Sequence, residues 1–415
     1  MSRRIAIIGS GISGLVSAYL LSEKFEVSLF EANNYVGGHT NTVSVEIADE
    51  RYALDTGFIV FNKKTYPNFC KLLEKLNVPI QLSEMSFSYR SMSSGFEYNG
   101  HNLNTLFSDR SNIFRPSFYR FIKEIISFNN DAKKFLAQSS DKKMSMEEFL
   151  GHHEYSSQFT ECYLLPMLSA IWSKSKEDTL SCSAQFACTF CENHGLLDLY
   201  NRPPWYVIAQ GSSSYIQPML EKIKDRVYLN TKIESIERNK NYVVLKSKCN
   251  EFKFDCVVIA THSNQALKLL SEPSIDEHKL LSAIKYTDNK VVLHTDEHIM
   301  PRKKLSWASW NYLDDGRSPP ALTYYMNRLQ SIQSPTNFFV SLNLSESIDK
   351  NKIIQHFNYE HPCFDLPALD AQQQKNLING LNNTYYVGSY WGYGFHEDGV
   401  KSAMDTCELI KGFDV

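Results

Sequence analysis

The sequence predicts an α/β fold built on a parallel sheet, combined with a second α+β domain that is discontinuous in sequence. Three observations lead to this prediction. The chain opens over 5–31 with a strand, a helix and a second strand, read from the spacing of apolar residues. The stretch over 86–204 is dominated by helical periodicity, and the stretch over 286–375 alternates aromatic and polar residues as antiparallel strands do. Strands return after each of these stretches, which indicates that the first domain is interrupted twice.

The opening unit has the features of a Rossmann-type dinucleotide-binding fold. The apolar run from Ile5 to Ile8 passes directly into the turn Gly9-Ser10-Gly11-Ile12-Ser13-Gly14, and helical spacing follows it. In such a turn Gly9 allows the tight bend, Gly11 lets a pyrophosphate approach the backbone, and Gly14 lets the helix pack closely on the strand. The N-terminus of the helix then offers free N–H groups and a partial positive charge to the phosphate.

An acidic residue at the end of the second strand supports this interpretation. Glu31 follows the strand expected over 27–30, where a carboxylate accepts hydrogen bonds from ribose hydroxyls, and Ala32 comes next. A glycine-rich turn without a ligand would leave this acid unexplained. We expect no secretory signal here, because three glycines and four serines interrupt the apolar stretch between residues 9 and 22.

A second glycine motif distinguishes FAD from NAD. Val36-Gly37-Gly38-His39-Thr40 follows Glu31, and Asp55-Thr56-Gly57-Phe58 follows the next pair of expected strands. With these motifs the sequence resembles the flavin-dependent amine oxidase superfamily, which includes monoamine oxidases, phytoene desaturases and protoporphyrinogen oxidase. More closely, over nearly the whole chain, it resembles a bacterial subgroup of NAD/FAD-binding amine oxidase-like proteins. Val36 and His39 stand where the superfamily often has arginines, so the phosphate contact of those arginines is absent here.

The resemblance implies FAD as the cofactor, held in a glutathione reductase-like domain. In that family the two-glycine turn lies close to the dinucleotide, the acid-x-Gly loop runs near the flavin ring, and a strand residue matched by Ile233 meets the adenine. A second buried strand ends near the dinucleotide, and a C-terminal helix starts under the flavin. Tyr390 stands where the family usually has an acid. The motif and the resemblance together give these expected FAD contacts: Gly9, Gly11, Ile12, Ser13, Gly14, Glu31, Ala32, Gly37, Gly38, His39, Thr40, Asp55, Thr56, Gly57, Phe58, Ile233, Ala260, Thr261, Gly388, Ser389, Gly399 and Val400.

The domain division follows the alternation of these patterns. We expect an FAD domain formed by residues 1–85, 205–285 and 376–415, and a substrate domain formed by 86–204 and 286–375. Individual elements are also expected. They include helices over 62–76, 115–136 and 401–410, a helix opened by the capping box that starts at Ser145, and strands over 291–294, 307–312, 322–326, 338–342 and 384–387.

Composition limits the class of protein. The 415 residues carry 43 Lys and Arg against 46 Asp and Glu, a net charge of −3, which does not favour nucleic-acid binding. No run of 18 apolar residues occurs, so we expect no membrane span, although contact with a membrane surface stays possible. Nine cysteines without a regular framework favour a reducing compartment, and we expect a cytoplasmic protein.

Three residues are candidates for catalysis. Lys290 precedes an expected strand, as does the amine oxidase lysine that holds a water against flavin N5 in the resembling family; the alternative is a solvated lysine at a strand end. His396 and Glu397 stand directly before the expected C-terminal helix, as acid–base groups or as helix caps. Cys182, Cys188, Cys191 and His194 have a spacing that a zinc site can use, but cysteines in an apolar helix are usually just packed, and we expect no metal.

The expected reaction is hydride transfer from a substrate C–H to flavin N5, which gives a double bond or, if reversed, an isomerisation. The abundance of aromatic residues favours a large apolar substrate such as a fatty acyl chain or an isoprenoid. The alternatives are an amine oxidase that forms an imine and hydrogen peroxide, and a flavin-bound protein without catalysis. The residues expected to line an apolar pocket are Trp172, His194, Trp205, Trp307, Trp310, Tyr312, Tyr325, Trp391 and Tyr393.

Overall fold

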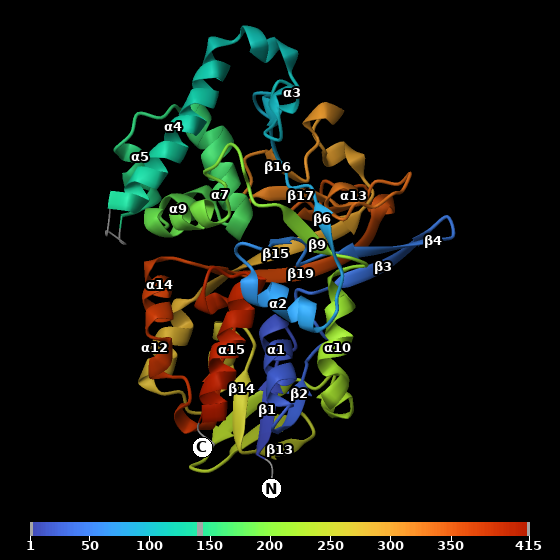
Figure 1. The fold of residues 1–415 in the computed structure, drawn as a ribbon, viewed down its shortest axis with the longest axis vertical. Coiled ribbons are helices and arrows are strands. Elements are labelled where there is room, and N and C mark those ends of the chain that lie inside the picture. Colours follow the sequence, from blue (N-terminus) through green and yellow to red (C-terminus); the bar gives the residue numbers. More distant parts are fainter. Residues whose placement is uncertain (1–2, 139–143, 413–415) are drawn as a thin grey trace.

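A parallel sheet forms one half of the protein, as the sequence predicts. The computed structural model describes residues 3–138 and 144–412. Five strands pair in parallel in the order β10-β2-β1-β14-β20. They span Val227–Tyr228, Glu26–Phe30, Arg4–Ile8, Cys256–Ile259 and Thr384–Tyr386. Segments from three distant parts of the chain thus meet in one sheet, with both chain ends at this end of the molecule (Figure 1).

Both faces of this sheet are covered, which explains the unbroken apolar runs of its strands. Ile5 and Ile7 point to a core shared with helices α1, α10 and α15, while Ala6 and Ile8 point to a second core on the opposite face. The helices on the first face span Ile12–Leu21, Ile216–Leu220 and His396–Gly412. The second face carries a three-stranded antiparallel sheet and two helices, namely β11 (Ile233–Arg238), β12 (Val243–Ser247), β13 (Glu251–Phe254), α11 (Ser263–Leu269) and α12 (Ile275–Ala283).

A seven-stranded mixed sheet crosses the middle of the molecule (Figure 1). Its order is β19-β15-β18-β17-β16-β7-β8, and its strands span Ile353–Cys363, Lys285–His294, Phe339–Leu342, Ala321–Tyr325, Trp310–Asp314, Phe87–Ser91 and Glu97–Asn99. A core rich in aromatic residues joins this sheet to a group of helices at the far end from the termini. These helices are α3 (Leu103–Leu106), α4 (Pro116–Gln138), α5 (Met146–Gly151), α6 (Ser157–Phe159), α7 (Leu165–Trp172), α8 (Lys176–Leu180) and α9 (Ala184–Asn193).

Short elements connect the two large sheets. A hairpin of β3 (Thr42–Ile47) and β4 (Glu50–Asp55) projects from the side of the molecule (Figure 1). A small sheet is ordered β5-β9-β6, with strands Phe61–Asn62, Trp205–Ile208 and Ile80–Ser83. Three further helices complete the fold, α2 (Pro67–Lys75), α13 (Met326–Leu329) and α14 (Leu366–Gln373). The predicted division into two discontinuous domains stays a prediction.

Several element boundaries differ from the sequence prediction. The helix expected over 62–76 begins only at Pro67, whose fixed φ suits a first helical position, and a short strand precedes it. The strand expected over 307–312 spans Trp310–Asp314. The C-terminal helix begins at His396, so His396 and Glu397 lie in its first turn and not before it. The capping box at Ser145 is confirmed, because Ser145 and Glu148 exchange side chain-to-backbone hydrogen bonds at the start of α5.

No helix in the described part of the chain is long and apolar enough to cross a membrane.

Candidate active site

The glycine turn after β1 is built as a cradle. Gly9 has a positive φ of +99°, and its N–H donates to the Phe30 carbonyl at 2.8 Å. A Cβ atom on Gly14 would lie 1.9 Å from the Gly9 carbonyl oxygen, so this contact tolerates no side chain. A Cβ atom on Gly11 would meet nothing within 4 Å. Gly14 is thus required by the fold itself, whereas the bare backbone at Gly11 faces open space, which fits a closely approaching ligand.

The acid at the end of β2 and the two-glycine turn are fixed to this cradle. The buried Glu31 carboxylate accepts hydrogen bonds from the Ser10 N–H at 3.0 Å, the Ser10 hydroxyl at 2.6 Å and the Asn33 N–H at 2.9 Å. The Gly37 N–H donates to the Ser10 carbonyl at 3.1 Å, and a Cβ atom on Gly38 would lie 3.1 Å from the Gly11 Cα. The predicted phosphate and ribose residues are therefore in contact with one another, while Ala32 is exposed beside them.

The loop over 55–58 packs against the two-glycine turn, but its acid points elsewhere. The Phe58 N–H donates to the His39 carbonyl at 2.7 Å, and a Cβ atom on Gly57 would lie 2.3 Å from that same oxygen. Asp55 is fully buried and accepts hydrogen bonds from Thr42, Ser212 and Gln330, and its burial raises its pKa to about 6. Asp55 thus ties the hairpin to its neighbours, and the loop offers its backbone and Thr56 to the site.

His396 is buried among aromatic and hydroxyl-bearing side chains. Its ring stacks on Phe58 with centroids 3.5 Å apart, and its Nε2 lies 3.0 Å from the Thr40 hydroxyl and 3.2 Å from the Tyr215 hydroxyl. Burial lowers the pKa of His396 to about 3, so its imidazole is neutral. The structure therefore assigns His396 contacts that join the start of α15 to the cofactor loops.

Glu397 caps a neighbouring helix. Its carboxylate accepts hydrogen bonds from the Asn68 N–H at 3.1 Å and the Phe69 N–H at 2.9 Å, which are free backbone N–H groups of the first turn of α2. The Asn68 side-chain amide donates to the same carboxylate at 2.7 Å. Asp398 accepts a hydrogen bond from the Phe395 N–H at 2.9 Å. The two acids at the start of α15 thus hold α2 and the preceding loop in place.

We expect Glu397→Gln to lower the free energy of unfolding by about 1–2 kcal/mol. The glutamine side chain replaces one accepting oxygen with an NH₂ donor, so one donor of α2 faces another donor and loses its acceptor. Thermal unfolding checks this, with Glu234→Gln on exposed β11 as the matched control. Flavin content stays at the wild-type value in both variants. Unchanged stability combined with lost turnover would contradict the cap and return Glu397 to an acid–base role.

The remaining predicted contacts surround the cradle. Ile233 is buried at the start of β11, and the carbonyl oxygen of Ala260, just after β14, lies close to Gly9. Gly399, where a Cβ atom would lie 2.8 Å from Ile12, brings the N-terminus of α15 against that of α1. Other residues expected at the cofactor lie in the same connections, Thr261 after β14, Gly388 and Ser389 after β20, and Val400 in α15. Two helix N-termini with their partial positive charges therefore converge at one place.

The structure does not bring Lys290 to this site. Lys290 lies within β15 rather than before a strand, and it is exposed. Its neighbour Asn289 is buried and its side-chain amide lies 3.4 Å from His361. Because successive side chains of a strand point to opposite faces, Lys290 points away from the face that carries His361.

A cluster of rings lies beside the two-glycine turn, and among its members the sequence predicted only His39 as a cofactor contact. The ring of His39 lies 4.8 Å from that of Tyr359, 5.6 Å from His361 and 6.2 Å from His262. His262 lies 2.8 Å from the Glu360 carboxylate, His361 lies 3.0 Å from the Ser173 hydroxyl, and Tyr359 contacts Thr56. A signal existed for His262, since it directly follows the predicted cofactor residue Thr261.

The imidazoles of this cluster are neutral and one is unsatisfied. Burial lowers the pKa of His361 to about 4 and holds the pKa of His39 well below its usual range, and the neighbouring histidines add to both effects. The Nε2 atom of His39 is buried without a hydrogen-bond partner among the described residues, as is the Tyr390 hydroxyl. Buried polar atoms are nearly always paired, so these two positions fit contacts with a bound molecule.

The aromatic residues expected to line one pocket do not gather in one place. Trp172, His194 and Tyr393 all pack their rings on Phe190, and the Trp172 indole N–H donates to the Tyr393 carbonyl at 3.2 Å. Trp307 and Tyr325 instead belong to a small separate core with Phe339, and Trp391 packs on Tyr390. Trp205 stacks beside His194, while Trp310 and Tyr312 pack on the aromatic core from β16. The prediction of one common pocket from all nine residues is wrong, because the strands distribute them over several cores.

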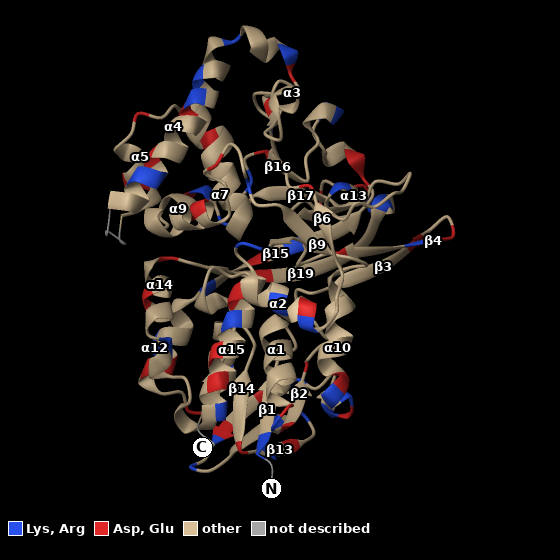
Figure 2. Ribbon diagram, in the orientation of Figure 1, with Lys and Arg blue, Asp and Glu red and all other residues tan. Residues whose placement is uncertain are grey.

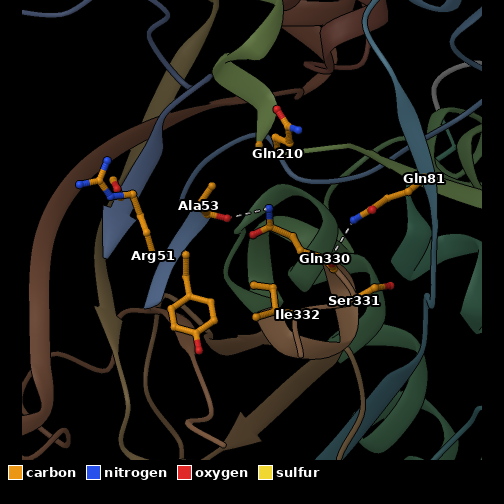
Figure 3. Close-up of a pocket in the computed structure, with 10 residues that line it drawn as sticks. Arg51, Ala53, Gln81, Gln210, Gln330, Ser331 and Ile332 are labelled. Atoms are coloured by element: carbon orange, nitrogen blue, oxygen red, sulfur yellow. Dashed lines mark hydrogen bonds between the residues drawn. The ribbon is translucent and has the colours of Figure 1, made fainter. Parts of the chain in front are cut away.

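A separate pocket of about 430 Å³ opens between the hairpin and α13 (Figure 3). Its wall mixes polar and apolar side chains. Within it Gln330 donates to the Ala53 carbonyl at 3.2 Å, and Gln81 donates to the Gln330 carbonyl at 2.8 Å. It is lined by Ser44, Arg51, Tyr52, Ala53, Gln81, Gln210, Gly211, Gln330, Ser331 and Ile332. None of the predicted cofactor or catalytic residues lines it.

No group of His, Cys, Asp and Glu side chains in the described ranges is arranged to hold a metal ion. Cys182, Cys188 and Cys191 are free thiols in the aromatic core, and burial raises the pKa of the Cys188 thiol to about 12. His194 stacks on Phe190 with its Nδ1 atom 2.9 Å from the Phe190 carbonyl oxygen.

Comparison with known proteins places this architecture among flavoenzymes. The family model for flavin containing amine oxidoreductases matches residues 12–332. Three solved structures share the fold over 99–100% of both chains: a redesigned triple mutant of putrescine oxidase (14% identity, TM-score 0.70), cyclohexylamine oxidase from Brevibacterium oxydans (13%, 0.69) and a CLA-producing fatty acid isomerase from P. acnes (16%, 0.67). No curated protein sequence matches this chain.

Proposed function

This chain belongs to the flavin containing amine oxidoreductase family and is an FAD-dependent oxidoreductase, and from this premise we propose that it desaturates or isomerises a large apolar substrate. The residues present fit the cofactor. The open backbone at Gly11, the acid Glu31 and the converging starts of α1 and α15 suit a pyrophosphate and a ribose. The unpaired Nε2 of His39 and the Tyr390 hydroxyl suit further polar contacts.

The chemistry divides between cofactor and protein. FAD, when bound, accepts a hydride from a substrate C–H bond. Formation of a C=C bond also releases a proton from the neighbouring carbon, and a neutral imidazole is able to take it. His361 and His39 are neutral at physiological pH because they are buried, and they lie beside Tyr359 and Thr56 at the cofactor loops. We therefore assign the proton-accepting role to this histidine cluster and not to His396, whose Nε2 is engaged by Thr40 and Tyr215.

The observation that favours an apolar substrate over an amine is the position of Glu397. An amine substrate carries a positive charge that needs a carboxylate or an aromatic cage. The Glu397 carboxylate, at the start of α15, is engaged in three hydrogen bonds from the start of α2. Trp172, Phe190 and Tyr393 form an apolar contact between the helical segment and the C-terminal loop. Burial of an alkyl chain yields roughly 0.8 kcal/mol per CH₂, so ten methylenes supply several kcal/mol after ordering costs.

Amine oxidation is the second candidate. It is favoured by Glu360, an anion on β19 that contacts His262 within the ring cluster. The putrescine and cyclohexylamine oxidases share this fold, and so does the fatty acid isomerase, so the fold alone does not choose among these substrates.

Anaerobic titration separates these functions. The holoenzyme is titrated with detergent-dispersed fatty acyl lipids, isoprenoids and polyamines while the flavin absorbance is followed. We expect bleaching or a spectral shift with a lipid class and none with polyamines, and we expect His361→Gln to slow the bleaching. Lys290→Met serves as the matched control and leaves the rate unchanged, because Lys290 lies on the opposite face of β15 from the cluster. A response to polyamines alone would establish the amine oxidase, and no response to any class would favour a flavoprotein without catalysis.

A further inference from the structure

A tip at the end of the molecule farthest from the chain termini exposes large apolar side chains (Figure 1). The tip comprises residues 101–123 and 302–305. Phe114 is 85% exposed and Leu103 is 74% exposed, and three further apolar side chains, Ile113, Tyr119 and Leu305, are also exposed there. Exposed apolar residues that occur singly need no explanation, but five that converge from α3, the turn over 110–114, the start of α4 and the segment over 304–306 form a patch.

The tip is rigidly built, so this exposure does not result from a loose loop. The Arg110 guanidinium donates to the carbonyl oxygens of Asn104 and Phe107, which ties the turn over 110–114 to α3. Behind the turn, Asn112 and Phe118 are buried, and the ring of Phe107 lies 5.1 Å from that of Phe118. The Tyr119 hydroxyl donates to the Ile113 carbonyl at 2.9 Å. The fold therefore presents these apolar side chains outward on a fixed support.

The charge of the tip is opposite to that of the whole chain. Residues 101–123 and 302–305 contain seven Lys and Arg against one Asp, in a protein with a net charge of −3. Figure 2 shows basic residues along the outer part of α4. Lys303 pairs with Asp109 at 3.0 Å and Arg120 pairs with Glu124 at 2.9 Å. Among the ion pairs of the described residues, none involves the side chains of Arg110, Arg115, Lys123 or Arg302.

We propose that this tip docks the enzyme on the surface of an anionic lipid bilayer. Exposed Phe and Leu side chains surrounded by Arg and Lys suit such a surface in two ways. The apolar side chains enter the boundary between headgroups and acyl chains, and the cations contact the lipid phosphates. A second copy of this chain would repel the same basic surface, and an ordinary protein partner gives no reason for the unpaired cations. A bilayer also holds a large apolar substrate, an argument that rests on the proposed function, whereas the patch and its charge do not.

Flotation of the holoenzyme with lipid vesicles tests the proposal. We expect binding to vesicles of phosphatidylcholine mixed with phosphatidylglycerol, little binding to phosphatidylcholine alone, and weaker binding at high salt because the attraction is screened. The double variant Leu103→Ser, Phe114→Ser loses about tenfold in partitioning. Ile275→Ser is the matched control, because Ile275 on α12 is 88% exposed but lies away from the tip.

A second pair of variants tests the charges. Arg115→Gln with Lys123→Gln lowers binding to the anionic vesicles about tenfold. Lys222→Gln with Lys224→Gln removes the same charge from the exposed turn over 221–226 in the other half of the molecule and leaves binding unchanged. Full binding by the tip variants, equal binding to neutral and anionic vesicles, or no binding at all overturns the proposal. A concentration-dependent dimer that the same tip variants abolish, without vesicle binding, assigns the tip to a second copy instead.

This experiment is separate from the test of the proposed function. Flotation needs no turnover, and the flavin titration uses substrate dispersed in detergent. A protein that is bleached by lipids but does not float with vesicles overturns the docking tip and leaves the proposed function in place. A protein that floats with vesicles but is bleached only by polyamines supports the docking tip and overturns the proposed function.

Discussion

Replacement of Gly11 with alanine is expected to give a protein that folds normally but purifies with little FAD. Gly11 has a φ of −64° and a ψ of 177°, which any residue adopts, and an added Cβ atom would meet no protein atom within 4 Å. The same Cβ atom would occupy the open space in which a pyrophosphate meets the backbone. We expect FAD affinity to fall about 100-fold, a loss of roughly 3 kcal/mol, with thermal unfolding of the apoprotein unchanged.

Two other glycine variants make this test specific. Gly14→Ala places a Cβ atom 1.9 Å from the Gly9 carbonyl oxygen, so it damages the apoprotein as well as FAD binding. Gly151→Ala at the end of α5 meets nothing within 4 Å, lies outside the cradle, and leaves stability and flavin content unchanged. FAD content is measured from the absorbance of the supernatant after acid precipitation. Normal flavin content in Gly11→Ala would mean that the open space in front of the turn is not the phosphate site.

The second large effect is a loss of stability in mild acid. Burial lowers the pKa of His194, His294 and His361 to about 4 and that of His396 to about 3. Because these folded-state pKa values lie below the usual histidine pKa of about 6.5, the unfolded chain binds more protons at pH 4–6.5. The stability that these histidines contribute is complete above pH 6.5 and declines as the pH falls toward 4.

Three buried carboxylates, Asp55, Asp398 and Glu397, have raised pKa values and oppose this trend without reversing it. Burial raises the pKa of Asp55 and Asp398 to about 6, so the folded state binds their protons first and gains stability as the pH falls. At pH 4 the four histidines lower the free energy of unfolding by roughly 13 kcal/mol, and Asp55 and Asp398 raise it by roughly 5 kcal/mol, at 1.36 kcal/mol per pKa unit. The net loss of roughly 8 kcal/mol is comparable to the whole stability of a typical domain. We therefore expect the protein to unfold in mild acid.

Thermal unfolding at pH values from 7.5 to 4.5 measures this effect. We expect the midpoint to fall steadily below pH 6.5. His294 lies on β15, where its ring contacts the Ser341 hydroxyl. We expect His294→Asn to make the decline of stability with falling pH less steep, because one proton fewer is taken up on unfolding. His101→Gln changes an exposed residue and leaves the pH dependence as it was. A midpoint that is constant between pH 7 and 5 would contradict this, because it would show that the folded and unfolded states bind equal numbers of protons in this range.

The cofactor half of the molecule was largely predictable from sequence. Its features lie close together along the chain: the apolar run at 5–8, the glycine turn and Glu31. Their roles follow from local backbone geometry. The capping box at Ser145 is equally local, since its partner Glu148 is three residues away. The prediction of FAD combined these motifs with the family resemblance, and the family match supports it.

The catalytic candidates were less predictable because their roles depend on distant partners. The sequence position of Glu397 suited an acid–base role and a cap equally well. The hydrogen bond from Asn68, which is 329 residues away, favours the cap. Lys290 was placed by the alternation of β15, whose inward face is set by its pairing with β18 and β19. The tip likewise draws its residues from two segments nearly 200 positions apart in the sequence.

The sequence by itself determined the parallel sheet, the glycine cradle and the acid that follows it, because the chemistry of these features lies within one βαβ unit. Only the tertiary structure decided which polar groups gather around the cofactor loops. His39, His262 and His361 come from three segments, and no periodicity links them. They meet because β19 lies beside the loops that follow β2 and β14, and their burial there keeps them neutral, which depends on the tertiary packing as a whole.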